Sequence, residues 1–251
     1  MALTDAWTAR WWVAPAELRG RATHWLACRA LPLAVLLALM VGAVLAGENL
    51  LSESATLRFA QRYGDQAARR LAGWEELMRT HRDSPELEKL QKVNAYFNQL
   101  PWLSDEKHWG KRDYWATPLE MMGTYGGDCE DYSVAKFITL VHMGVDPMRM
   151  RITYVRASKL RQPHMVVAYY AKPGSQPLIL DNLIPQIRLG SQRRDLIPVY
   201  SFNTAGLWAS KADGETRRVG APSRLSAWRD VSRRLREDGI DVSALKQAKQ
   251  P

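Results

Sequence analysis

Apolar side chains recur every three or four residues in the part of the chain that follows residue 50, with charged residues between them. The first series consists of Phe59, Tyr63, Ala67, Leu71, Trp74 and Leu77. This spacing predicts an amphipathic helix over Ser52–Thr80. A typical helix start at Pro85-Glu86 and a second apolar series that ends before Pro101 predict another helix. Residues 102–115 are predicted to form a loop, and Thr117–Glu120 the start of a short capped helix.

After Gly144 the pattern changes to short runs rich in β-branched and aromatic residues, separated by turn residues. The predicted strands are Met150–Val155, Met165–Tyr170 and Pro177–Leu180. Leu196–Phe202 and a segment near Leu207 are expected to add edge strands, and Ala227–Glu237 is expected to be a basic amphipathic helix. Helices followed by an antiparallel sheet indicate the α+β class, with a helical N-terminal lobe.

Between these two halves lies the stretch around which the chain is organised. Gly126-Gly127 allows a tight turn, Asp128 is a good N-cap, and an apolar series then runs at helical spacing to Met143-Gly144. Cys129 is therefore expected on the first turn of a buried helix. Unpaired amides and the helix dipole favour a thiolate at that position. Two interpretations are open, a nucleophilic cysteine or a small apolar core residue.

The two strands that follow in the chain provide partners for such a nucleophile. His164 precedes the strand Met165–Tyr170, and Asp181 follows the strand Pro177–Leu180. If these strands form a hairpin, His164 and Asp181 lie at the same edge of the sheet. Together with Cys129 they would supply the nucleophile, base and orienting carboxylate of acyl-transfer chemistry. Separately, an edge histidine and a turn aspartate have ordinary structural explanations.

Three acidic residues surround the cysteine, and their charges oppose thiolate formation. Asp128, Glu130 and Asp131 would raise the pKa of the thiol. A bound divalent cation would reverse this effect, and closely spaced carboxylates suit Ca²⁺. The spacing is not that of an EF-hand. The alternative is that these acids only complement the dipole of the helix.

Composition and charge limit the remaining choices. The formal net charge of the 251 residues is +9, which suggests anionic surroundings or an acidic partner. There is no recognisable nucleic-acid-binding motif, and nucleic acid is not an expected partner. The cysteines are Cys28 and Cys129. If the segment that holds Cys28 is removed or anchors the chain, a disulfide framework and a multi-cysteine zinc site are both excluded.

The N-terminal segment has the pattern of an export signal. Leu31–Ala46 is an apolar run of 16 residues without charge, preceded by Arg29 and ended by small residues. We expect export with cleavage near Ala46, or an uncleaved inner-membrane anchor. The expected division is residues 1–46 as signal or anchor and 47–251 as the folded domain, which would face the periplasm of a bacterial cell.

Four stretches of this chain resemble the bacterial transglutaminase-like cysteine proteinases. They are DYWATPLE, GGDCEDYSVAKF, QPHMVVAYY and LILDNL, and the resemblance covers roughly residues 50–210. It implies a papain-like or transglutaminase-like fold with Cys129 as nucleophile, His164 as base and Asp181 as orienting carboxylate. It also implies calcium dependence through the acidic residues of the cysteine motif. By analogy with transglutaminase-like enzymes, the indole N–H of Trp115 is a candidate oxyanion donor beside the backbone N–H of Cys129.

The same resemblance implies a biological setting. The substrate would be the N-terminal region of a very large surface adhesin, cut after a pair of small residues (Ala-Ala), and release of the adhesin would disperse a biofilm. An inner-membrane cyclic-di-GMP receptor similar to LapD would sequester the protease. Two alternatives keep the fold and change the function, namely a transglutaminase-type acyl transferase and a non-catalytic periplasmic binding module.

Overall fold

The computed structural model describes residues 50–158, 162–211 and 216–240. The chain divides into two units, residues 1–48 and 49–251, and every described residue belongs to the second. The expected cleavage near Ala46, the alternative anchor Leu31–Ala46 and Cys28 therefore lie outside the described residues. Within the described ranges, none of the helices combines the length and the apolar character that a membrane span requires.

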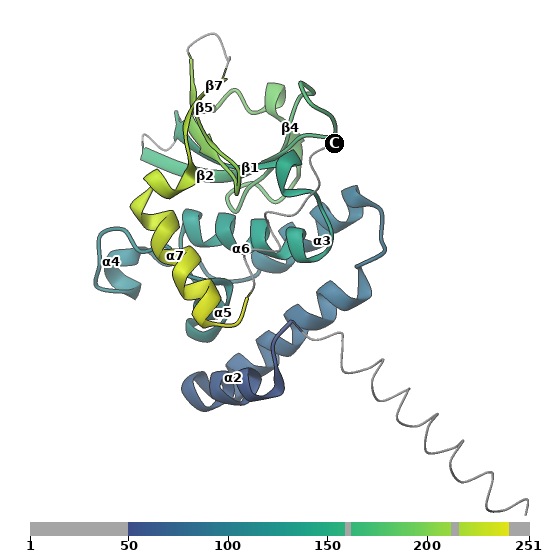
Figure 1. Ribbon diagram of the computed structural model, residues 1–251, viewed down its shortest axis with the longest axis vertical. Coiled ribbons are helices and arrows are strands. Elements are labelled where there is room, and N and C mark those ends of the chain that lie inside the picture. Colours follow the sequence, from purple (N-terminus) through teal and green to yellow (C-terminus); the bar gives the residue numbers. More distant parts are fainter. Residues whose placement is uncertain (1–49, 159–161, 212–215, 241–251) are drawn as a thin grey trace, which may run out of the picture. The chain divides into compact units, whose positions relative to one another are not determined.

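The described residues form helices and one antiparallel sheet (Figure 1). The helices are α2 (Glu53–Thr80), α3 (Glu86–Phe97), α4 (Asp105–His108), α5 (Pro118–Thr124), α6 (Cys129–His142) and α7 (Ser226–Glu237). The strands are β1 (Met150–Ala157), β2 (Gln162–Tyr169), β3 (Leu178–Leu180), β4 (Arg188–Leu189), β5 (Leu196–Phe202), β6 (Leu207–Ser210) and β7 (Thr216–Gly220). Their order across the sheet is β4-β3-β2-β1-β5-β6-β7. The predicted α+β class is confirmed.

The predicted helices are all present, with changes at their boundaries. Helix α2 is kinked at Gly64, whose backbone has left-handed φ of 80°. Helix α3 ends at Phe97, earlier than the expected boundary before Pro101. The predicted loop contains the single turn α4. Helix α5 begins with the expected capping box, in which Thr117 and Glu120 bond each other's backbone amides.

Two expectations about the sheet were wrong. Strand β2 begins at Gln162, so His164 lies inside the strand and does not precede it. Pro163 is the second residue of β2, a position at which a strand tolerates a missing N–H. Strands β5 and β6 are not edge strands, because β5 pairs with β1 and β6, and β6 pairs with β5 and β7. Strand order depends on long-range pairing, which local sequence patterns do not encode.

All of the longer helices lie on one face of the sheet, with α6 against β1 and β2 (Figure 1). The main core lies in this layer and includes Trp74, Phe97, Phe137 and Phe202, all fully buried. Trp228 of α7 makes edge-on contacts with Phe137 and Phe202 and so joins α7 to α6 and β5. Burial of α6 between the other helices and the sheet fixes the position of its first turn.

Candidate active site

Backbone hydrogen bonds to a buried carboxylate hold the start of α6. Asp131 accepts from the backbone amide of Asp128 at 3.1 Å and from that of Ala116 at 2.6 Å, so it ties the helix start to the segment before α5. A Cβ atom at residue 127 would lie only 2.3 Å from Asp131 Oδ2. Gly127 is therefore required by close approach, and the first turn of α6 is held in one conformation.

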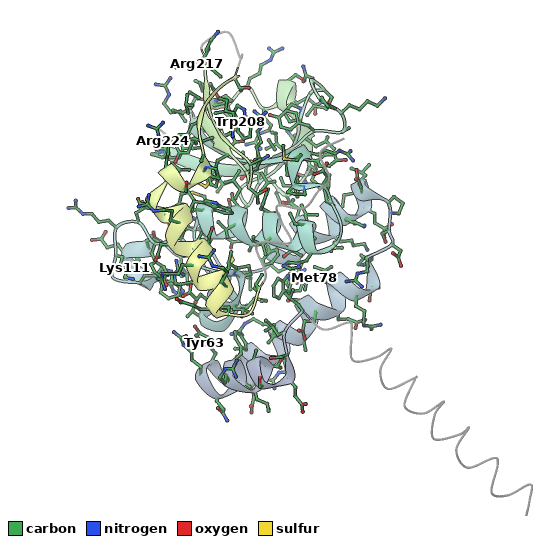
Figure 2. All side chains as sticks on the ribbon, viewed as in Figure 1. Tyr63, Met78, Lys111, Trp208, Arg217 and Arg224 are labelled. Carbon is green, nitrogen blue, oxygen red and sulfur yellow. The ribbon has the colours of Figure 1, made fainter. Side chains whose placement is uncertain are left out.

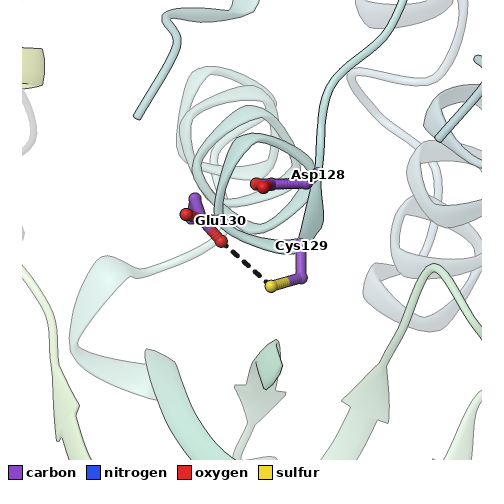
Figure 3. A group of neighbouring side chains, drawn as sticks. All are labelled: Asp128, Cys129 and Glu130. Atoms are coloured by element: carbon purple, nitrogen blue, oxygen red, sulfur yellow. Dashed lines mark hydrogen bonds between the residues drawn. The ribbon is translucent and has the colours of Figure 1, made fainter. Parts of the chain in front are cut away.

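Cys129 occupies that first turn, as predicted, and its side chain points towards the strands (Figure 3). Its thiol donates to Glu130 Oε2 at 2.9 Å. Burial raises the pKa of the thiol well above its usual value, and the Glu130 and Asp128 carboxylates add to the rise. The backbone amide of Met165 acts in the opposite direction and lowers the pKa of the thiol. The thiol therefore lies near the residue that follows His164.

His164 and Asp181 meet as the hairpin predicted. The ladder between β2 and β3 ends at the pair Val167–Leu180, and Asp181 follows directly. Beyond the end of this ladder His164 Nε2 lies 2.8 Å from Asp181 Oδ1, and both side chains are buried. The contact is diagonal rather than directly across the strands, within reach of an imidazole.

The charge of Asp181 is well compensated. Burial alone would raise the pKa of this carboxyl, but hydrogen bonds from His164, from the amide of Leu183 and from Arg193 bring it down to about 2. Arg193 Nη2 lies 2.8 Å from Asp181 Oδ2, and Asp195 holds the guanidinium through Nε and Nη2. An ionised carboxylate only accepts hydrogen bonds. His164 Nε2 must therefore carry the proton, which leaves Nδ1 as the basic nitrogen of a neutral ring.

A second set of contacts supports Asp181 from the helical side. The side-chain amide of Asn98 donates to the backbone carbonyl of Asp181 at 2.8 Å. Lys136 of α6, which is buried, donates to Asn98 Oδ1 at 2.7 Å. Burial lowers the pKa of Lys136 to about 7, although the negative charge of Asp181 opposes this shift.

The predicted acidic site is larger than the sequence indicated. Asp105 at the start of α4 and Asp113 in the following loop approach Glu130, and Asp105 also approaches Asp128 and Asp131. Asp105 Oδ1 and Asp128 Oδ1 are both buried and have no hydrogen-bond partner among the described residues. Burial raises the pKa of Asp105 to about 6, although the amide of Tyr114 donates to its other oxygen.

These five carboxylates are suited to holding a cation. Burial, together with Glu130 and Asp131, raises the pKa of Asp128 well above its usual range. Hard oxygen donors crowded together, two of them without partners, are the donor set that Ca²⁺ prefers. Asp131 differs from the others, because both of its oxygens already accept backbone amides.

Trp115 has a different set of contacts from the one expected. Its indole N–H donates to Asp113 Oδ1 at 2.9 Å, and its ring stacks on Phe202 with 5.7 Å between the ring centroids. The side chain is buried, and Arg234 of α7 donates to its backbone carbonyl. In this structure the indole donor is engaged locally, and the assignment of Trp115 to an oxyanion hole stays a prediction.

Sequence reasoning missed the residues that reach the site over long distances in the chain. They are Asn98, Asp105, Asp113, Lys136 and Arg193. The loop before Trp115 gave no signal, because its three acidic residues are balanced by three basic ones. A basic residue near Asp181 could not be chosen among the many arginines of this chain.

Comparison with known proteins decides the family of the chain. Residues 52–213 match the family model of the bacterial transglutaminase-like cysteine proteinase BTLCP. The chain belongs to this family. No match was found among the curated proteins.

Solved structures of LapG from Legionella pneumophila resemble this member of the family. The calcium-bound form is 38% identical with a TM-score of 0.64, and the EGTA-treated form is 38% identical with a TM-score of 0.66. Each comparison covers 74% of this chain and 99% of the other. A further LapG structure is 37% identical with a TM-score of 0.65, covering 76% of this chain and 99% of the other.

Proposed function

We propose that this proteinase is a calcium-dependent endopeptidase whose catalytic triad is Cys129, His164 and Asp181. One observation carries the proposal. Cys129 begins the buried helix α6, which packs on β2, and the backbone amide of Met165 in β2 acts on the pKa of its thiol; the adjacent His164 is hydrogen-bonded to an ionised Asp181. Nucleophile, base and orienting group thus come from α6, β2 and the end of β3.

The chemistry follows from the tautomer of His164. Nδ1 takes the thiol proton of Cys129, and the thiolate attacks the carbonyl carbon of the scissile peptide bond. The resulting imidazolium, stabilised by Asp181, returns the proton to the leaving amine, which leaves an acyl-enzyme. Water, deprotonated by the same Nδ1, then hydrolyses the thioester and restores the thiol. The first amides of α6 have no partner within the helix, and that of Cys129 is a candidate oxyanion donor.

Calcium fits the acidic cluster, and Asp105, Asp113, Asp128 and Glu130 would hold it, with Asp131 shaping the loop. When bound, Ca²⁺ would supply positive charge next to the thiol and so favour the thiolate. In the structure the thiol instead donates a hydrogen bond to the Glu130 carboxylate. A relative, LapG of Legionella pneumophila, has been solved in a calcium-bound form. These observations support a cation requirement for this chain.

For the biological role we infer a periplasmic enzyme that cuts the N-terminal region of a large surface adhesin at an Ala-Ala type site. Its release would promote biofilm dispersal, under control of an inner-membrane cyclic-di-GMP receptor similar to LapD. Trp102, which is 54% exposed next to the site, is the candidate contact for this receptor. Trp102→Glu should weaken receptor binding, whereas Leu57→Glu, a similarly exposed position on α2, should not. Equal binding by both variants would remove Trp102 from the interface.

The deciding experiment incubates the enzyme with the N-terminal region of a candidate adhesin, with calcium and with EGTA. Cleavage that EGTA stops and added calcium restores is the expected result. Adding a small primary amine separates hydrolysis from acyl transfer, because only a transferase would incorporate the amine in preference to water. Cleavage at full rate in EGTA would contradict the calcium requirement, and amine incorporation without hydrolysis would favour the transglutaminase alternative.

A further inference from the structure

The face of the sheet opposite the helices is hollow. Figure 1 shows the helices on one side of the strands and none of comparable length on the other. Side chains of β1, β2, β3 and β5, with their connecting turns, line a hollow of about 2030 Å³ on this side. Drug-sized ligands occupy pockets of roughly 300–1,000 Å³. The size of this hollow therefore suits a polypeptide segment better than a small molecule.

The floor of the hollow is aliphatic. A small core cluster of Val155, Val166, Ala168 and Ile179 forms it, separate from the main core under the helices. Three larger apolar side chains that line the hollow are substantially exposed. They are Met148 at 49%, Ile197 at 45% and Val199 at 37%. Exposed aliphatic groups around a concave apolar floor are typical of a docking surface.

The charged residues that line the hollow are mostly basic. Among the described residues, five are arginine or lysine and one, Asp146, is acidic. Arg149 and Arg193 are ion-paired with carboxylates, whereas Arg151 and Arg156 have no carboxylate partner within the described residues. Arg151 instead packs over Trp208, with its guanidinium 4.1 Å from the ring centroid, and Figure 2 shows Trp208 among the strands. The uncompensated positive charge predicts an acidic ligand.

Arg193 is a further basic residue at the hollow. It lines the hollow and is 3% exposed, and its Nη2 is held by Asp181 and Asp195. Its Nη1 is buried and has no hydrogen-bond acceptor among the described residues. A guanidinium buried in this way and paired with two carboxylates is out of reach of a ligand in the hollow and adds little to its charge.

We propose that this hollow, defined by the aliphatic floor and by Arg151 and Arg156, is a docking site for an acidic, aliphatic segment of a partner protein. A flat bilayer would contact only the rim of a concave surface. A nucleic acid strand would need stacking partners where the floor has aliphatic groups. The site is separate from Cys129, and the proposal does not depend on the peptidase activity.

The test measures binding of a short fluorescent peptide of alternating Glu and Val to the full chain by fluorescence anisotropy. Arg156 is exposed and has no carboxylate partner among the described residues, so Arg156→Glu should keep the fold and weaken binding by about tenfold. Ile197→Ser should weaken binding by about threefold.

Arg58→Glu, an exposed position on α2, is the matched control and should bind the peptide normally. Cys129→Ala should also bind normally, which separates docking from catalysis. Thermal midpoints within about 2 °C of that of the unaltered chain would establish that the variants fold.

Two further peptides and an oligonucleotide test which chemical features of the ligand the hollow recognises. A Lys-Val peptide should not bind, and a Glu-Ser peptide should bind more weakly than Glu-Val. A single-stranded oligonucleotide that binds more tightly than Glu-Val and displaces it would overturn the proposal in favour of nucleic acid. Equal loss of binding in Arg58→Glu and Arg156→Glu would overturn it in favour of non-specific attraction to a basic protein.

Discussion

Asp181 and Asp128 are both buried acidic residues of the candidate active site, yet their surroundings shift their pKa values in opposite directions. Burial raises the pKa of each, because a charge is poorly solvated inside a protein. Asp181 also receives hydrogen bonds from His164 and Leu183 and an ion pair from Arg193, so its pKa falls to about 2. Asp128 has acidic neighbours instead, and its pKa rises further.

This difference divides the site into two halves. In the base half, built on β2 and β3, Asp181 is paired with His164 and Arg193, and Arg193 is also paired with Asp195, so opposite charges face each other within the protein. The nucleophile half, at the start of α6, contains carboxylate oxygens without partners and a thiol hydrogen-bonded to Glu130. We infer that the first half is preorganised, whereas the second depends on a bound cation for its working state.

Removal of the nucleophile should have the largest effect. Cys129→Ala deletes the one thiol of the described residues and should lower the cleavage rate by about 10⁴-fold or more. The thermal midpoint should change by no more than about 2 °C, because the substitution removes a single side-chain atom from a half-buried residue. Cleavage assays with and without calcium, together with a thermal melt, check both expectations. Retained cleavage would reject the role of Cys129.

The next largest effect tests whether the nucleophile half needs a cation. Asp128→Asn should weaken calcium binding by about 10- to 100-fold, as loss of a metal-site group commonly does. In EGTA the same variant should be more stable than the unaltered chain, because a neutral amide replaces a carboxylate that burial disfavours. Titration calorimetry and thermal melts measure the two quantities. Asp65→Asn, exposed on α2, is the control.

Opposite changes in affinity and stability are what distinguish a metal ligand from a structural residue. If Asp128→Asn lowered stability in EGTA and left calcium affinity unchanged, Asp128 would be a helix cap and nothing more. Asp105→Asn should behave like Asp128→Asn, because Asp105 Oδ1 is likewise buried without a partner.

A smaller effect on the cleavage rate is expected when the contacts that hold Asp181 are weakened. Arg193→Lys keeps the positive charge near Asp181 but loses the planar fork that contacts both Asp181 and Asp195. Given the proposed triad, kcat should fall by about tenfold with little change in KM, since Arg193 positions the base and does not touch the substrate. Steady-state kinetics of this variant and of Arg188→Lys, exposed on β4, provide the comparison. A change confined to KM would place Arg193 in substrate binding instead.

The two halves also differ in how far the sequence could predict them. Cys129 on a first helical turn follows from Gly126-Gly127 and Asp128, which are local signals. The meeting of His164 with Asp181 follows from a hairpin, also a short-range feature. These predictions needed only the order of neighbouring elements.

What the sequence could not predict depends on packing between distant segments. Arg193 and Asn98 reach Asp181 from a turn and from the end of a helix, and no spacing in the sequence identifies them. Asp105 joins the acidic cluster only because α4 folds beside the start of α6. For Trp115 the analogy with transglutaminase-like enzymes suggested an oxyanion donor. In this structure the indole N–H donates to Asp113, which is only two residues away in the chain.

The smallest effect concerns the acid stability of the base half. The pKa of Asp181 is about 2 in the folded protein, below its ordinary value, so its ionisation stabilises the fold at neutral pH and this contribution is lost as pH falls towards 2. Between about pH 5 and about pH 3 the unaltered chain should lose about 1 kcal/mol that Asp181→Asn does not lose. Urea unfolding of both proteins at the two pH values measures the difference. If both proteins lost the same free energy of unfolding, the ionised Asp181 would not stabilise the fold. Asp181 and Asp128 would then not differ in the way inferred, and the distinction between the two halves would fail.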